Sequence, residues 1–239
     1  MEADDYLDMP DLNVVDKLVT IPPRAMAIYR DIEAEFIATL DGGDVLTAPT
    51  NASAGMKCRQ IANGAVYLSE DSRSKAHNFE ELHNEKLDML DELLEEIGEH
   101  PVLIAYEFQH DLHRISRRHL DWPCLTGMSG ESLQYTIREF NAGNITRLLI
   151  QSSQAHGLNI QEGCHHLVWY GLTWNWEDYK QMVDRLYRQG QSATMVMVYR
   201  LLAEGTLDIQ VASRLEEKME EELRVKRAAA EKGREIRGA

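Results

Sequence analysis

Three side chains near residue 185 have the types and spacing that bind an anion. The stretch DYKQMVDRLYRQGQ covers residues 178–191 and holds Gln181, Arg185 and Arg188 at intervals of four and three residues. At about 100° per residue of an α-helix, these positions fall within roughly 60° of one another. One helix face would then present an amide and two guanidinium groups, which suit a phosphate or carboxylate. We therefore expect an anionic ligand at this face.

The distribution of charge restricts where such an anion can bind. The 239 residues carry 25 basic and 40 acidic side chains, a net charge of −15, which argues against a general nucleic-acid-binding protein. From Lys180 onward there are 12 basic and 10 acidic residues, so the net charge is +2 there and −17 in the preceding part. Phosphate contacts are therefore expected to be local, with the C-terminal third as the best place for them.

Composition indicates a globular chain with a real core, since 44% of the residues are hydrophobic and 27% are charged. No apolar run approaches the eighteen or so residues of a membrane span, and the N-terminus is acidic, unlike a targeting leader. A cytoplasmic protein is therefore expected. Cys58, Cys124 and Cys164 lie far apart and are interpreted as reduced and structural. His165 and His166 lack a third ligand at metal spacing, so no metal site is expected.

The first hundred residues are predicted to form a mainly helical lead-in. Residues 22–40 begin with prolines and then show apolar residues at helical spacing. Residues 78–98 carry a leucine-rich apolar stripe, with Asn78 and Glu81 as a capping pair at the start. Residues 43–55 are rich in Gly, Ala, Thr and Asn and are expected to be a loop.

Beyond residue 100, short apolar runs alternate with amphipathic segments. PVLIAY, CLTG, RLLIQSS, HHLVWYG and ATMVMVYRLL are predicted strands, separated mostly by predicted helices. This alternation predicts an α/β fold with a mostly parallel sheet, whose ligands bind at the carboxyl ends of the strands. Loops at residues 152–163 and 171–178 are expected there. The predicted parts are a helical lead-in at 1–100, an α/β domain at 101–212 and a charged C-terminal helix at 213–239.

The order of these segments resembles the second RecA-like lobe of superfamily 2 helicases, and specifically of the Swi/Snf-type DNA translocases. Motif VI of that family, Q-x-x-x-R-x-x-R-x-G-Q, is matched at all its fixed positions, and the GLN at 157–159 resembles motif V. Asp184 favours the Swi/Snf branch over the RNA-helicase branch. The resemblance extends more loosely over residues 15–212 and includes MKCRQIANGAVYL. The motif VI matches are Gln181, Arg185, Arg188, Gly190 and Gln191.

This resemblance implies roles for the anion-binding residues. In the family, two motif VI arginines reach across a cleft to the γ-phosphate of ATP that the first lobe holds. By that likeness Arg188 is the expected arginine finger and Arg185 its companion on the γ-phosphate, while Gln181 positions them or the nucleotide. Further nucleotide contacts are expected at Gly157, Asn159 and Gln191.

The resemblance also implies contacts with DNA. Motif V in the family touches the DNA backbone as well as sensing the nucleotide. Hydroxyls and amides at four other positions resemble family positions that contact the tracked strand, although simple turn chemistry explains them equally well. The four predicted DNA contacts are Thr126, Gly127, Ser152 and Ser153.

The chain departs from the family pattern in two places. The family usually has D-x-x-W-N-P before motif VI, whereas this chain has Gly171 for the acid and Trp176 for the proline. Trp174 and Trp176 could stack on a base or pack on a partner lobe, and packing is favoured. The sequence also has no phosphate loop of the form G-x-x-x-x-G-K-[S/T] and no acidic Mg²⁺ motif after an apolar strand.

We therefore expect the C-terminal lobe of an ATP-dependent DNA helicase or translocase, acting in the cytoplasm or wherever the DNA is. ATP and Mg²⁺ would be bound only when a first lobe is joined to it, in the same protein or as a separate polypeptide. The chain alone is expected to be inactive and to bind neither tightly. The alternative is a non-catalytic module, derived from such a lobe, that binds DNA or docks a partner.

Overall fold

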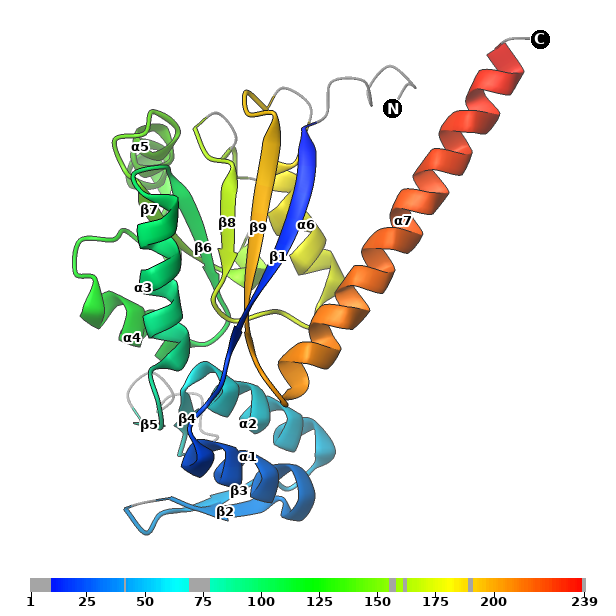
Figure 1. The fold of residues 1–239 in the computed structure, drawn as a ribbon. Coiled ribbons are helices and arrows are strands. Elements are labelled where there is room, and N and C mark those ends of the chain that lie inside the picture. The colour runs from blue at the N-terminus through cyan, green and yellow to red at the C-terminus, as the bar shows by residue number, and fades with distance from the viewer. Residues whose placement is uncertain are drawn as a thin grey trace.

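A five-stranded sheet forms the centre of the computed structural model (Figure 1). Every neighbouring pair of strands is parallel, so all the carboxyl ends lie at one edge, here called the carboxyl edge. The predicted α/β, RecA-like fold with a mostly parallel sheet is confirmed. In spatial order the strands are β1 (Asp11–Val19), β9 (Met195–Ala203), β8 (His166–Trp169), β6 (Val102–Tyr106) and β7 (Arg147–Gln151).

The structure describes most of the chain. No helix in the described part is long and apolar enough to cross a membrane. The described residues are 10–40, 42–68, 78–154, 158–160, 163–188 and 191–237, without the side chains of 223 and 225–237.

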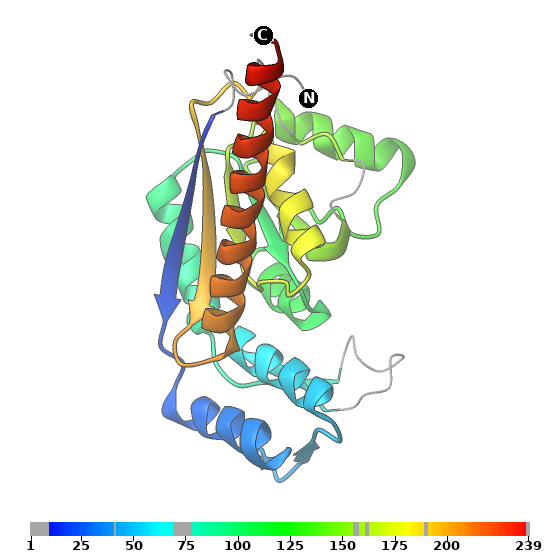
Figure 2. The ribbon, with the colours of Figure 1, turned by 90° about the vertical axis from the view of Figure 1, so that its right-hand side faces the viewer.

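Helices cover both faces of the sheet (Figures 1 and 2). Because successive side chains of a strand point to opposite faces, Val102 and Ile104 contact one helical layer, whereas Leu103 and Ala105 contact the other. Burial on both sides explains why β6 is apolar throughout. The first layer holds α3 (Glu85–Ile97) and α4 (Gln109–Arg118), and the second holds α5 (Gly130–Asn141), α6 (Trp176–Leu186) and α7 (Leu207–Arg237).

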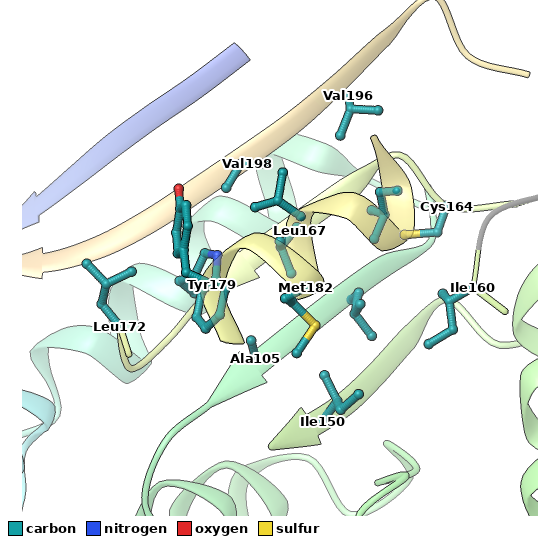
Figure 3. Packing of buried hydrophobic residues seen from close by; sticks show 14 of the residues in the cluster. Ala105, Ile150, Ile160, Cys164, Leu167, Leu172, Tyr179, Met182, Val196 and Val198 are labelled. Atoms are coloured by element: carbon teal, nitrogen blue, oxygen red, sulfur yellow. The ribbon is translucent and has the colours of Figure 1, made fainter. Parts of the chain in front are cut away.

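The larger core lies between the sheet and α6 (Figure 3). Tyr179, Met182, Val183 and Leu186 recur at helical spacing and are each at most 3% exposed. They pack against apolar side chains of the strands. This stripe fixes the rotation of α6 and leaves Gln181 and the positions near it on the flank of the helix. The strand residues in this core include Ala105, Ile150, Leu167 and Val198.

The N-terminal helices lie at the carboxyl edge of the sheet, below β1 and β9 in Figure 1. Loops that follow the strands there meet α2, so this edge is partly covered rather than open. The elements of this part are α1 (Pro23–Glu35), α2 (Asn51–Asn63) and two antiparallel pairs, β2 (Ile37–Thr39) with β3 (Val45–Thr47) and β4 (Ala65–Tyr67) with β5 (Phe79–Glu81).

Three local expectations in this part are wrong in extent. The helical stretch expected over residues 22–40 ends at Glu35, and β2 follows it. The loop expected at residues 43–55 contains β3 and the start of α2, because Thr50 caps that helix by accepting a hydrogen bond from Ser53 N at 3.1 Å. The helix expected from residue 78 begins only at Glu85, since the preceding residues pair with β4. The predicted division into residues 1–100, 101–212 and 213–239 stays a prediction, although β1 within the first of them is a strand of the main sheet.

A buried polar network joins α2, α3, α4 and α7. Lys86 is fully buried, and its ammonium donates to Asp208 Oδ2 at 2.6 Å and to Asn63 Oδ1 at 2.8 Å. Asn63 Nδ2 in turn donates to Asp111 Oδ2 at 2.9 Å, and Arg114 Nη1 donates to Asn63 O at 2.7 Å. Buried charges need such partners, so the network ties the N-terminal helices to the sheet domain.

Two histidines are expected to make the protein sensitive to acid. Burial lowers the pKa of His83 and of His166 from 6.5 to about 4. The unfolded chain takes up these protons as the pH falls through 6.5, whereas the folded chain takes them up only near pH 4. The free energy of unfolding should therefore fall as the pH is lowered from about 6.5 to about 4. Urea unfolding at several pH values in this window measures the fall. His83→Gln should make the free energy of unfolding fall less steeply with decreasing pH. If the variant shows the same pH dependence as the wild type, His83 does not contribute to the acid sensitivity.

Candidate nucleotide and DNA interface

Helix α6 carries two of the three predicted anion-binding residues. Its N-cap, Asn175, accepts a hydrogen bond from Glu177 N at 3.0 Å and starts the helix directly after the carboxyl edge. Gln181 and Arg185 are one turn apart and both half-buried. The structure thus places the amide and the first guanidinium on one flank of the helix, as the spacing predicts.

Arg188 does not lie on the same helix, so the expectation of three residues on one helical face is wrong. The helix ends at Leu186, and the Arg188 N–H bonds back to Leu186 O at 3.2 Å in the turn that follows. Gln191 N then donates to Arg188 O at 3.3 Å. The Arg188 side chain is exposed and makes no hydrogen bond or ion pair within the described part of the chain. Its guanidinium is therefore available to an anion from outside.

Arg185 is tied to the segment that resembles motif V. Its Nη1 donates to Leu158 O at 3.1 Å, and its buried Nε has no partner among the described residues. From the other side, Asn141 Nδ2 donates to Asn159 O at 2.9 Å. A Cβ at Gly163 would lie 2.3 Å from Asn141 O, so the chain can return past Asn141 only with glycine there. Two helices therefore hold the backbone that presents the exposed Asn159 side chain.

Gln181 and Gln191 differ in how far their amides are already used. Gln181 Oε1 is buried without a hydrogen-bond partner in the described ranges. Gln191 Nε2 donates to Cys164 O at 3.0 Å and to Leu186 O at 3.1 Å, which anchors the turn after α6 to the start of β8. Its predicted contact with a nucleotide stays a prediction. Gly157 lies outside the described residues.

We call Gln181, Arg185, Arg188 and the segment 158–159 the arginine site. Neither arginine makes an ion pair with a carboxylate in the described part of the chain. The neighbouring Asp184 is held on the other flank by Lys180 at 2.6 Å. The exposed guanidinium of Arg188, and the lack of a carboxylate on either arginine among the described residues, suit a polyanion such as a nucleotide phosphate.

The residues predicted to touch DNA lie at the carboxyl edge, around the end of β7. Thr126 Oγ1 accepts a hydrogen bond from Gln151 N at 3.2 Å, which brings the two predicted loops together. Ser152 is only 3% exposed, and its hydroxyl donates to Glu107 Oε2 at 2.5 Å, so that hydroxyl is used inside the protein. Their contact with DNA stays a prediction. The two exposed residues of the set are Gly127 and Ser153.

Arg59 of α2 is a residue of this edge that the sequence did not single out. Its Nη2 donates to Leu172 O at 2.8 Å and lies 3.1 Å from Glu107 Oε1. Its guanidinium also lies 5.4 Å from the ring centroid of Phe108 and 5.5 Å from that of Trp174. Burial raises the pKa of Glu107 above its ordinary value, while the charge of Arg59 acts in the opposite direction. The only available signal was the loose likeness of MKCRQIANGAVYL to a family element.

The structure gives a physical reason for Gly171 where the family has an acid. A Cβ at Gly171 would lie 2.5 Å from Asn63 Nδ2 and 3.1 Å from Asp111 Oδ2. The hydrogen-bonded Asn63–Asp111 pair therefore occupies the space that a longer side chain would need.

Gly171→Ala is consequently expected to lower the free energy of unfolding by about 1–3 kcal/mol, because the added methyl overpacks this site. The matched control is Gly55→Ala in α2, where a Cβ meets nothing within 4 Å. That change should be neutral or stabilise by up to about 1 kcal/mol. Urea unfolding monitored by circular dichroism compares them, and equal effects would contradict the packing argument.

Trp174 and Trp176 occupy different environments. Trp174 is 47% exposed and lies against Arg59, whereas Trp176 is half-buried and stacks on Tyr179 with ring centroids 6.2 Å apart. Trp176, which replaces the family's proline, thus packs within the lobe.

Among the residues that the structure describes, the cysteines and histidines form no comparable site. The three cysteines are free, and burial raises the pKa of Cys58 and Cys164 to about 12. The rings of His165 and His166 lie 4.4 Å apart. No group of three or more potential ligands is arranged for a metal ion in the described ranges.

Known proteins are similar to this chain in sequence, and part of the chain matches a known domain family. Residues 85–190 match the helicase conserved C-terminal domain family. Putative protein p41 of Acyrthosiphon pisum secondary endosymbiont phage 1 is 34% identical over 221 residues, which is 90% of this chain and 45% of that protein. The CHD3-type chromatin-remodeling factor CHR7 of Arabidopsis thaliana is 29% identical over 69% of this chain and 15% of that protein. The chromatin-remodeling ATPase INO80 of Eremothecium gossypii is 26% identical over 86% of this chain and 14% of that protein. The chain thus spans less than half the length of these relatives.

A solved structure shares the fold. The crystal structure of the C-terminal part of the Fun30 ATPase domain matches with a TM-score of 0.57 and covers 86% of this chain and 89% of that chain. At 15% identity this likeness concerns the fold alone. Residues 85–190 are thus similar to a helicase C-terminal domain, the parallel sheet has the fold of a RecA-like lobe, and the similar proteins include chromatin-remodelling factors, as the resemblance to Swi/Snf-type lobes implies.

Proposed function

We propose that the chain works as the second lobe of an ATP-dependent DNA translocase. In this role it supplies arginines to a nucleotide held by a first lobe, and backbone amides and hydroxyls to DNA. The observation that carries the proposal is the arginine site, where Arg188 is exposed and unpaired within the described chain and Arg185 is bonded to the segment that resembles motif V.

Arg188 is the proposed arginine finger. ATP, held with Mg²⁺ by a first lobe in the same protein or in a separate polypeptide, supplies the phosphoryl group whose transfer to water releases free energy. Arg188 would donate hydrogen bonds to phosphoryl oxygens as negative charge builds up on them. A planar, permanently charged fork suits this task, and such a residue contributes about 10³- to 10⁵-fold in rate. The sequence supports a shared site because it contains no phosphate loop.

Arg185 would link the nucleotide to the rest of the lobe. Its Nη1 holds Leu158 O, while its Nε has no partner among the described residues. Because this half-buried guanidinium makes no ion pair with a carboxylate in the described part of the chain, it would serve a phosphate oxygen and the 158–159 backbone together. Gln181 lies one turn earlier and would orient the Arg185 guanidinium through its amide oxygen, which has no partner among the described residues. Closing and opening of the cleft between the two lobes would thus move the segment that resembles motif V.

DNA would contact the carboxyl edge near the end of β7. Gly127 and Ser153 are exposed there, and Thr126 joins their loops. Backbone N–H groups and hydroxyls of such loops bind phosphate oxygens without reading the base sequence. This mode of contact needs few basic residues and so fits a chain with a net charge of −15.

The test is DNA-stimulated ATP hydrolysis by the chain alone and after mixing with a polypeptide that supplies a first lobe. The proposal predicts hydrolysis only in the mixture. Hydrolysis by the chain alone would overturn it. If the two polypeptides associate and remain inactive while the chain still binds DNA, the non-catalytic module replaces the translocase.

A further inference from the structure

We propose that Arg59 is a positioning residue for the DNA-contacting loops at the carboxyl edge. This inference rests on the proposed contact of those loops with DNA. It assigns Arg59, which lies in the N-terminal part of the chain, a function in a site formed by the sheet domain. The reasons are its burial, the set of loops that it joins and its contact with an exposed aromatic ring.

Arg59 lies where three parallel strands end. It is 7% exposed, and its Nη2 bonds Leu172 O in the loop after β8 and lies 3.1 Å from Glu107 Oε1 directly after β6. The other carboxylate oxygen of Glu107 accepts a hydrogen bond from the hydroxyl of Ser152, the first residue after β7. One guanidinium and one carboxylate therefore cross-link the loops that follow three neighbouring strands.

The same guanidinium holds an aromatic ring at the surface. It lies over both the Phe108 ring and the Trp174 ring, at 5.4 Å and 5.5 Å from their centroids. Trp174 lies in the loop after β8, and 47% of its surface remains exposed despite this contact. A cation placed near an aromatic ring in this way attracts it and restricts its orientation. Arg59 thereby fixes the shape of the edge from the Ser152 loop to the Trp174 loop.

Arginine is the residue type that this arrangement requires. A planar guanidinium can bond a carbonyl, pair with a carboxylate and stack on rings at the same time, whereas a lysine ammonium on a flexible stem cannot. Arg59→Lys would keep the charge next to Glu107 but lose the stacking. The lysine variant should therefore restore only part of the function that alanine removes.

The first experiment measures positioning without DNA. The chain is labelled with 5-fluorotryptophan, and the ¹⁹F resonance of Trp174 is assigned by its loss in Trp174→Phe. Arg59→Ala is expected to move this resonance toward the position of free fluorotryptophan, and Arg59→Lys to move it part of the way. Arg117→Ala is the matched control, because Arg117 makes a bidentate ion pair with Glu81 on the surface of α4. An unchanged Trp174 resonance in folded Arg59→Ala would overturn the proposal.

The second experiment measures duplex DNA binding by the same variants. Arg59→Ala should weaken binding by about 3- to 30-fold, the usual range for a residue that acts through others. Arg59→Lys should lie between it and the wild type, and Arg117→Ala should bind like the wild type. Equal affinity of Arg59→Ala and wild type, with a shifted Trp174 resonance, would overturn the role in DNA binding. Absence of DNA binding by the wild type would instead count against the proposed function, and the ¹⁹F measurement would still decide whether Arg59 positions the loops.

A folding defect would not remove the test. If circular dichroism shows that Arg59→Ala is unfolded, Glu107→Gln breaks the same network while it keeps the shape of the side chain. It should displace the Trp174 resonance and weaken DNA binding in the same direction, and an unchanged resonance and affinity would overturn the proposal.

Discussion

Replacing Arg188 by alanine in an assembly with both lobes is expected to lower kcat for ATP hydrolysis by about 10³-fold or more. The side chain is exposed and unpaired in the described chain, so its loss should leave folding intact. It should also leave DNA affinity unchanged, because Arg188 is outside the loops at the carboxyl edge. Steady-state hydrolysis at saturating DNA and ATP measures the effect.

Two further variants make this result specific. Arg188→Lys keeps the positive charge but not the planar fork, so it should recover little of the lost rate. Arg224→Ala removes another exposed arginine, one that pairs with Glu220 on α7 at 3.0 Å, and should hydrolyse ATP at the wild-type rate. Full activity of the Arg188→Ala assembly would exclude the finger.

Lys86→Met is expected to have the largest effect on stability and to lower the free energy of unfolding by about 3–5 kcal/mol. Lys86 and Asp208 are 0% and 5% exposed and 2.6 Å apart. Methionine fills a similar volume but leaves the Asp208 carboxylate buried without its cation. Asn63 Oδ1 loses its donor as well. Urea unfolding of the wild type and of Lys86→Met at neutral pH measures the difference in their free energies of unfolding.

The matched control is Lys17→Met, which breaks a surface ion pair of the same length. Lys17 lies 2.6 Å from Glu96, whose side chain is 62% exposed. Solvent screens such a pair, so the change should cost about 0–1 kcal/mol. Similar losses for the two lysines would mean that the buried network does not hold the N-terminal helices to the sheet domain.

Much of the sheet domain could be predicted because its signals are local. An apolar run such as residues 102–106 can be buried on both faces only in the middle of a covered sheet, and the stripe of α6 repeats at helical spacing. The position of β1 could not be predicted in this way. Its partner β9 begins at Met195, far along the chain, and no local pattern reveals that pairing.

The candidate site was predictable to the extent that its residues lie in one short motif. Gln181 and Arg185 share a helix flank as their spacing indicates, but the helix stops before Arg188, and only the tertiary structure shows the turn. Arg59 was missed because its partner Leu172 lies 113 residues away. The need for glycine at position 171 could not be predicted from the sequence, since only the folded chain brings Asn63 beside it.

The most direct test of the central claim is whether the arginine site stabilises the transition state of phosphoryl transfer. The assembly of both lobes is incubated with ADP, Mg²⁺ and aluminium fluoride, a mimic of the transferring phosphoryl group, and the trapped nucleotide is counted after gel filtration. We predict that the wild-type assembly traps the mimic, and that the Arg188→Ala assembly binds ADP equally well but does not trap it. Equal trapping by the two assemblies would contradict the claim that this lobe supplies the arginine finger.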